Sequence, residues 1–245
     1  MCRERTSGRD LHTIDCSLTG ICIAAWVAGE DDADPFPATN ALYYSKRVAQ
    51  ESDTWSPRAV LGNTVGDMDI DWKPSLATDN NGTWICAWEH GGGGGSEIDI
   101  LITRSLDDGD TWEPSVIVSG PDPRSDTEPS ICTDGLGSWL VAWDAPGINQ
   151  PSSVKYSEHD LFRVYSTDNG ATWSSVTPLN VNAGSDASID SMLSVSAGTV
   201  GSFLAVWASF ERPGSSPSGI YFARSFDAGN TWSVPELISP PNPDG

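Results

Sequence analysis

Seven acidic residues in three short segments are the most concentrated source of chemistry in this sequence. The segments are GDMDIDW (66–72), SDTEPS (125–130) and GSDASID (184–190). Gathered carboxylates could bind Ca²⁺, which takes six to eight oxygen ligands in irregular geometry. Two carboxylates with different pKa values could instead serve a glycosidase as acid and base. A solvated loop rim is the third alternative. The residues concerned are Asp67, Asp69, Asp71, Asp126, Glu128, Asp186 and Asp190.

A second acidic motif, SLDDGDTW at 105–112, has the composition of a calcium loop. It recurs as STDNGATW (166–173) and SFDAGNTW (225–232). A calcium loop would need matching acids in each copy and a distal bidentate Glu, but Asp108 and Asp110 have uncharged counterparts. The shared Asp can accept hydrogen bonds from its own turn, and the shared Gly supplies a positive φ. We therefore predict a structural role for Ser105, Asp107, Gly109, Thr111, Trp112, Ser166, Asp168, Gly170, Thr172, Trp173, Ser225, Asp227, Gly229, Thr231 and Trp232.

The elements that position these motifs also repeat. A damaged fourth copy of the turn runs from Ser45 to Trp55 and lacks the glycine. The closing tryptophans of the four copies recur about every 60 residues, which indicates stacked supersecondary units. An apolar segment precedes each turn, and its two faces are both apolar, which predicts a strand covered on both sides. These segments are CIAAW (22–26), WICAW (84–88), WLVAW (139–143) and FLAVW (203–207).

Each repeat contains four predicted strands. A short first strand and a Gly-containing turn lead into the Trp strand, and a loop, a third strand, the S-x-D-x-G-x-T-W turn and a fourth strand follow. Four antiparallel strands with both faces buried describe a blade of a β-propeller. We expect an all-β fold, with residues 1–245 as one propeller domain of four repeats of about 60 residues. The approximate repeats are 11–62, 71–120, 126–181 and 186–240.

The repeated turn resembles the Asp box, or bacterial neuraminidase repeat, of sialidases and of sortilin-type propellers. With its spacing, the resemblance covers nearly the whole chain. It implies a propeller with Asp boxes on the blade periphery, away from the substrate. It says less about activity, because this fold carries unrelated functions. Sialidase propellers have six blades, so four repeats leave three alternatives: a closed four-bladed ring, a fragment, or a subunit that assembles end to end.

The resemblance also implies a sialidase site. In that site three arginines on inner strands hold the substrate carboxylate, a Tyr activated by a Glu is the nucleophile, and an Asp is the general acid. No arginine of this chain lies in a Trp strand or in the short run before it, and the Phe-Arg-Ile-Pro motif is absent. The acidic segments would repel an anionic sugar. Four of the five tyrosines fall on predicted third strands. Tyr156, two residues from Glu158, is the remaining loop candidate for a nucleophile.

Charge and composition restrict the partners. Thirteen basic and 34 acidic residues give a net charge of −21, which disfavours nucleic acid and anionic membranes. No apolar run reaches the roughly 18–20 residues of a membrane span, and the basic start MCRERTSGRD is not followed by a convincing signal peptide. Cys22, Cys86 and Cys132 lie in apolar strands and are expected to be buried thiols, while Cys2 and Cys16 could form a disulfide.

We therefore expect a non-catalytic extracellular or cell-surface module. It would recognise a glycan or protein ligand, or self-associate through open blade edges. No cofactor is required, although Ca²⁺ could bind. The alternative is an exo-sialidase or another glycoside hydrolase that is truncated or completed by a partner chain.

Overall fold

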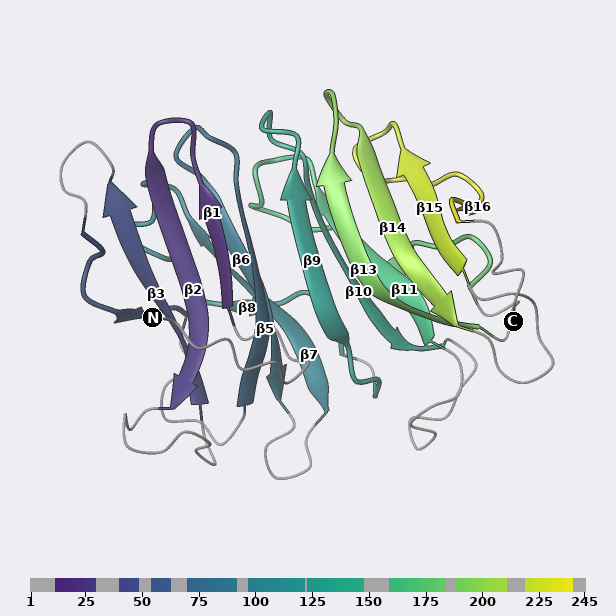
Figure 1. Ribbon diagram of the computed structural model, residues 1–245, viewed down its shortest axis with the longest axis horizontal. Helices are drawn as coiled ribbons and strands as arrows, with labels where there is room; N and C mark the ends of the chain where they lie inside the picture. Colours follow the sequence, from purple (N-terminus) through teal and green to yellow (C-terminus); the bar gives the residue numbers. More distant parts are fainter. Residues whose placement is uncertain are drawn as a thin grey trace.

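The protein is all-β. The computed structural model describes residues 12–29, 40–48, 54–62, 70–91, 97–121, 123–147, 159–183, 188–210 and 219–239, which form sixteen strands and no helix (Figure 1). Accordingly, the described residues include no helix able to span a membrane. The strands are β1 (His12–Cys16), β2 (Ile21–Gly29), β3 (Asn40–Val48), β4 (Ala59–Val60), β5 (Ile70–Thr78), β6 (Trp84–Gly91), β7 (Ile98–Ser105), β8 (Val116–Ile117), β9 (Thr127–Thr133), β10 (Trp139–Pro146), β11 (His159–Ser166), β12 (Thr177–Pro178), β13 (Ile189–Ala197), β14 (Phe203–Phe210), β15 (Gly219–Ser225) and β16 (Glu236–Leu237).

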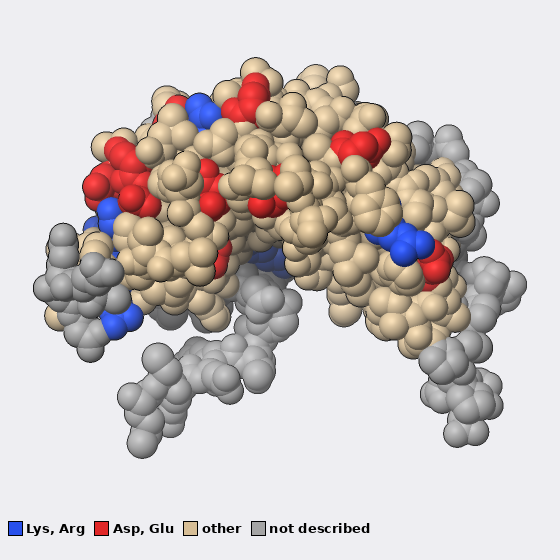
Figure 2. All heavy atoms as spheres, turned by 90° about the horizontal axis from the view of Figure 1, so that it is seen from above, with Lys and Arg blue, Asp and Glu red and all other residues tan. Residues whose placement is uncertain are grey.

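Consecutive strands pair antiparallel in four units of four strands, β1–β4, β5–β8, β9–β12 and β13–β16. The third and fourth units join through one parallel pair, His159 with Ile189, so the sheets have four, eight and four strands. The units stand side by side in chain order (Figure 1), and the molecule has an arched outline with one concave side (Figure 2). Among the described strands, no pairing links the first unit to the fourth, so the sheets form an open row.

The Trp strands form the core, as their two apolar faces predict. In β6, residues Trp84 to Glu89 are all buried, and β10 is buried over nearly its whole length. Trp88, Trp143 and Trp207 have exposed fractions of 2% or less, which confirms that they are core residues. Trp26 of the first unit is only half-buried. Each central unit therefore lies between two neighbouring sheets.

The three intact S-x-D-x-G-x-T-W turns have the same hydrogen bonds. In the second unit, Gly109 N donates to Ser105 Oγ at 2.9 Å, and the backbone N–H of Thr111 donates to Asp107 Oδ1 at 2.8 Å. The Thr111 hydroxyl donates to Asp107 Oδ2 at 2.6 Å. These bonds recur at Asp168 and Asp227 with distances that differ by 0.1 Å at most. The shared Asp thus closes its own turn.

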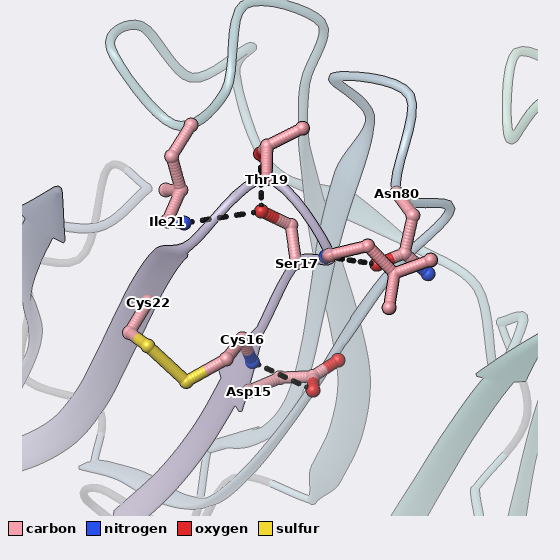
Figure 3. Close-up of a disulfide and its surroundings, with 8 residues drawn as sticks. Asp15, Cys16, Ser17, Thr19, Ile21, Cys22 and Asn80 are labelled. Atoms are coloured by element: carbon pink, nitrogen blue, oxygen red, sulfur yellow. Dashed lines mark hydrogen bonds between the residues drawn. A yellow bond between two sulfur atoms is a disulfide. The ribbon is translucent and has the colours of Figure 1, made fainter. Parts of the chain in front are cut away.

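The first hairpin carries a disulfide between Cys16 at the end of β1 and Cys22 in β2 (Figure 3). The alternative of a disulfide between Cys16 and Cys2 is therefore wrong, as is the expectation of a free thiol at Cys22. Those two cysteines lie directly opposite in the β1–β2 register, which places their side chains together. The turn between them docks on the second unit, where Leu18 N donates to Asn80 Oδ1 at 2.7 Å. Cys86 and Cys132 are free and buried, as predicted.

Candidate functional site on the inner strands

The first strands of the four units, β1, β5, β9 and β13, together line one cavity. Its volume is about 570 Å³. Neighbouring first strands are in contact, so residues far apart in the sequence meet here. The lining residues are His12, Thr13, Lys73, Pro74, Ser75, Glu128, Pro129, Met192 and Leu193.

A repeated β-bulge positions three of these side chains. In β5, β9 and β13, two residues lie opposite a single Trp of the next strand, so each first strand holds one extra residue. The first bulged residue has a positive φ in each case, 46° for Lys73, 58° for Glu128 and 57° for Met192. Non-glycine residues rarely adopt this conformation, and it is found at functional sites more often than elsewhere. The bulges therefore place Lys73 and Glu128 on the cavity lining.

An ion cluster occupies the cavity wall. Lys73 Nζ lies 2.5 Å from Glu128 Oε1 and 3.5 Å from Glu89 Oε1. The same Glu89 oxygen accepts the backbone N–H of Glu128 at 2.7 Å. The side chain of Glu89 is 3% exposed, whereas those of Lys73 and Glu128 are 22% and 37% exposed. Lys73 thus links a buried carboxylate to one that faces the cavity.

Burial and charge shift the pKa values of this cluster. Burial raises the pKa of Glu89, although the Lys73 ammonium opposes that shift. Burial works against protonation of Lys73, but its hydrogen bond to Glu128 and the carboxylates of Glu89, Glu128 and Asp144 raise its pKa overall. Three carboxylates therefore hold the ammonium in its charged form.

One histidine–carboxylate pair interacts with the cluster, and a second pair lies in the second unit. His159 Nδ1 is 3.0 Å from Asp144 Oδ2, and burial raises the pKa of that Asp144 carboxyl. Asp144 also interacts electrostatically with Lys73 and Glu128. In the second unit, His90 Nδ1 is 2.9 Å from Asp71 Oδ1. Asp144 therefore extends the acidic surroundings of the cavity.

Three of the predicted acidic residues serve as buried acceptors. Asp71 and Asp126 accept the indole N–H groups of Trp88 and Trp143 at 2.9 and 2.6 Å. Asp190 Oδ2 accepts a hydrogen bond from Asn180 Nδ2 at 2.9 Å. All three Asp side chains are at most 2% exposed, so the alternative of a solvated rim is wrong for them.

Glu128 is the predicted acidic residue that lines the cavity. Within the described ranges, no group of three or more His, Cys, Asp or Glu side chains is arranged to hold a metal ion. The remaining candidates, Asp67, Asp69, Asp186, Tyr156 and Glu158, lie outside the described residues.

Four residues of this site were not predicted from the sequence: Lys73, Glu89, Asp144 and His159. A signal for two of them was present, because an acid directly follows the last Trp of the apolar segment in WEHG (88–91) and WDAP (143–146). A charge that extends a doubly buried strand needs a partner. The partner could not be identified, because Lys73 lies on a different strand and reaches Glu89 through a bulge.

We expect the free energy of unfolding to be largest at about pH 5. The raised pKa values of Glu89 and Asp144 mean that the folded state binds more protons than the unfolded state above about pH 4, so stability falls as pH rises through the raised values. Hydrogen bonds from Thr111 and Thr172 lower the pKa values of Asp107 and Asp168 to about 2, so their contribution is lost as pH falls below about 4. Urea unfolding at pH 3, 5 and 8 measures both limbs.

The variant Glu89→Gln is the control for the fall in stability between pH 5 and pH 8. In this variant the free energy of unfolding should change less over that range. A free energy of unfolding that rises steadily from pH 5 to pH 8 would contradict the role given to the buried acids.

Comparisons with known proteins agree with this architecture. Residues 20–245 match the family model described as BNR repeat-like domain, whereas no curated protein matches the chain. A Hadza microbial sialidase is 18% identical with a TM-score of 0.59, and the match covers 91% of this chain and 45% of that one. A protein of unknown function from Dyadobacter fermentans is 16% identical, with a TM-score of 0.65 and 95% and 70% coverage. An α-L-arabinofuranosidase of Fusarium graminearum, solved with arabinobiose, is 16% identical, with a TM-score of 0.55 and 89% and 62% coverage.

These similarities concern the fold. The chain spans less than half the length of the sialidase and about two thirds of the other two proteins.

Proposed function

Because the chain belongs to the family of BNR repeat-like domains, we propose that its four units are blades of a sialidase-like β-propeller that binds a carbohydrate without cleaving it. The ligand would occupy the cavity between the inner strands. The family and the fold neighbours support the propeller assignment, since those neighbours include a sialidase and an arabinofuranosidase. As in the sequence-based prediction, we favour recognition over catalysis.

The observation that carries this proposal is the ion pair of Lys73 and Glu128 on the cavity lining. Both groups are partly exposed, so the carboxylate can accept hydrogen bonds from the hydroxyl groups of a sugar and the ammonium can donate hydrogen bonds to them. The two charges compensate each other, which stabilises both on the cavity lining. Such preformed polar groups in a concave site are typical of ligand-binding pockets.

The cavity favours an uncharged or amine-bearing sugar over sialic acid. Carboxylate ligands are usually held by the paired N–H groups of arginine. None of the described residues that line the cavity is an arginine, and Lys73 is already surrounded by Glu89, Glu128 and Asp144. The face seen in Figure 2 carries more Asp and Glu than Lys and Arg side chains, and the net charge is −21. This field disfavours an anionic ligand.

A second candidate function, glycoside hydrolysis, is favoured by one specific observation. Glu89 and Glu128 contact the same ammonium, but their surroundings differ: Glu89 is 3% exposed and burial raises its pKa, whereas the side chain of Glu128 is 37% exposed. Two nearby carboxyl groups in different environments are what retaining glycosidases use as acid and nucleophile. Glu89 would need access to the glycosidic oxygen, and at 3% exposure it has little. For this reason hydrolysis comes second.

An extracellular location is part of the proposal. The Cys16–Cys22 disulfide supports it, because disulfides persist in oxidising compartments. A net charge of −21 is compatible with a protein that stays dispersed in such surroundings.

Calorimetric titration with neutral, amino and sialylated oligosaccharides tests the proposed binding. We expect saturable binding of a neutral or amino sugar that Glu128→Gln weakens at least about tenfold, which is about 1.4 kcal/mol. Asp108→Asn is the matched control, since it removes one negative charge at a position where another copy of the turn has Asn169. Failure of the whole panel to bind at millimolar concentration would overturn the proposal.

Fluorogenic arabinofuranosides and sialosides, assayed with the same proteins, separate recognition from catalysis. Turnover that Glu128→Gln abolishes would replace recognition by hydrolysis as the function of this cavity.

A further inference from the structure

In each of the first three units, one aliphatic side chain packs against the box glycine of the unit that follows. We call this residue the seat, and the three seat residues are Ile23, Ile85 and Leu140. A Cβ atom added to Gly109 would lie 2.2 Å from Ile23 Cδ1 of the first unit, and one added to Gly170 would lie 2.4 Å from Ile85 Cδ1 of the second. Gly229 sits in the same way over the third unit, where Leu140 Cδ1 would be 3.3 Å away. A side chain at Gly109 or Gly170 would therefore clash with the neighbouring sheet, and all three box glycines have a positive φ in their own turns.

A polar side chain beside each seat holds the same box. Lys46, Arg104 and Tyr165 lie directly opposite the three seat residues in the strand register. Lys46 Nζ donates to Asp110 Oδ1 at 2.7 Å, and an Arg104 N–H donates to the Asn169 carbonyl at 3.0 Å.

The third unit makes two contacts of this kind. The Tyr165 hydroxyl donates to Asn230 Oδ1 at 2.9 Å. An N–H of Arg163 donates to the carbonyl oxygen of Asn230 at 2.7 Å. Each box is thus seated by a glycine on an aliphatic side chain and by hydrogen bonds from the adjacent third strand.

The fourth unit has the same seat, but its residues are exposed. The residue equivalent to Ile23, Ile85 and Leu140 is Leu204, which is 40% exposed, whereas each of those three is fully buried. Arg224 lies opposite Leu204, and its side chain is 51% exposed against 15% for both Lys46 and Arg104.

The neighbouring positions show the same contrast. Ile220 is 40% exposed, and its equivalents Leu42, Ile100 and Leu161 are fully buried. Ile238 donates its backbone N–H to Ile220 as Leu61, Val118 and Leu179 do to the equivalents of Ile220. Ile238 is 54% exposed, whereas those three residues are at most 8% exposed.

The innermost strands show the same difference. Ser75 and Ser130 each accept a backbone N–H from the first strand of the following unit, from Ile131 at 3.3 Å and Val195 at 3.1 Å. Ser194, which occupies the equivalent position in β13, is exposed. The surface of the fourth unit therefore repeats, from inner to outer strands, a face that the following unit covers elsewhere in the chain.

We propose that this surface, formed by Leu204, Ile220, Arg224 and Ile238 and here named the fourth-unit face, docks one further Asp-box sheet unit. The partner is recognised by a box glycine that seats on Leu204 and by a polar box residue or carbonyl that binds Arg224. The boxes at Gly109, Gly170 and Gly229 are already seated on units of this chain. The turn of the first unit lacks the glycine. The occupant is therefore an intact Asp-box unit in addition to the four described here, and this inference is independent of carbohydrate binding.

An extended chain tests the docking directly. A second copy of residues 180–239, joined after Ser239, supplies an intact box to the fourth-unit face. We expect amide hydrogen exchange in β14 and β15 to slow at least tenfold relative to the original chain. Leu204→Asp in the extended chain should abolish this protection, whereas Val200→Asp, at an exposed hairpin position, should leave it unchanged. Unchanged exchange in β14 and β15 of a folded extended chain would overturn the proposal.

Two measurements on the original chain keep the proposal testable if the extended chain does not fold. Leu204→Asp should leave the melting temperature within a few degrees of the original, whereas Leu140→Asp, at the covered seat, should prevent cooperative folding. Equal damage by both substitutions would show that Leu204 is already covered. Light scattering supplies the second test. A dimer that Leu204→Asp dissociates would mean that a second copy covers this face without a free box, which would overturn the assigned partner.

Discussion

The variant Lys73→Met is expected to lose about 2–3 kcal/mol of the free energy of unfolding at pH 7.5, less than a fully buried pair would lose because Lys73 is 22% exposed. The substitution keeps most of the side-chain volume but leaves Glu89 buried and without its ammonium. Asp144 and Glu128, which Lys73 now compensates, would then act on Glu89 as uncompensated negative charges. Chemical denaturation followed by tryptophan fluorescence measures the loss.

The pH dependence of that loss identifies its cause. Glu89 in the variant should bind a proton at higher pH than it does now, so the difference from the original protein should shrink as pH falls from 7.5 to 5. The double variant Lys73→Met, Glu89→Gln should recover most of the lost stability, because it removes the stranded charge. A loss that is equal at both pH values would show that Lys73 acts through packing alone.

The variant Asp126→Ala is expected to be destabilised by about 2–3 kcal/mol, since it removes the charged acceptor of a buried donor. Asp126 Oδ1 is 2.6 Å from Trp143 Nε1, and Trp143 is fully buried. Water cannot replace the carboxylate at that depth without opening the core. Urea unfolding, with the same denaturant dependence in both proteins, measures the difference.

A double-mutant cycle separates this hydrogen bond from the other contacts of Asp126. In a Trp143→Phe background, which lacks the indole N–H, Asp126→Ala should cost at least about 1 kcal/mol less than in the original protein. Asp126→Asn, which keeps an acceptor oxygen and the volume, should lose less than Asp126→Ala. Additive effects of the alanine and phenylalanine substitutions would show that the bond to Trp143 contributes nothing measurable.

The same indole–carboxylate bond joins Asp71 to Trp88, and in both pairs the Asp precedes the Trp by the same number of residues. The spacing is therefore visible in the sequence, but it does not show that the Asp accepts the indole N–H. Acidic segments before a strand are equally compatible with a solvated rim, a cation site and a buried acceptor. Which of these forms depends on whether the neighbouring sheet covers the carboxylate, and here it covers Asp71, Asp126 and Asp190.

The fold was largely predictable because its signals are local and repeated. A doubly apolar Trp strand, a Gly-containing hairpin and a closing box occur in each repeat, and each needs only nearby residues to form. The expected four strands are present in all four units, and the buried cores at Trp88, Trp143 and Trp207 follow from the apolar pattern. Whether the row of units closes was left open by the sequence, and the described strands form an open arrangement.

The disulfide shows where local reasoning failed. Cys16 and Cys22 flank a short turn and lie opposite each other only because the strands pair in one particular register. Shifting that register by one residue would place the two side chains on different faces of the sheet. The sequence alone did not specify the register of this hairpin closely enough to identify Cys22 as the partner of Cys16.

The sequence by itself determined the all-β units, their number and the geometry of each box, because hydrogen bonds such as those of Asp107 join residues at most four positions apart. Only the tertiary structure decided which side chains meet between units. Lys73, Glu89 and Glu128 come from three strands and two units, and a bulge in each inner strand directs their contact. The exposed seat at Leu204 likewise becomes visible only against its covered equivalents, since exposure depends on what the neighbouring sheet occupies.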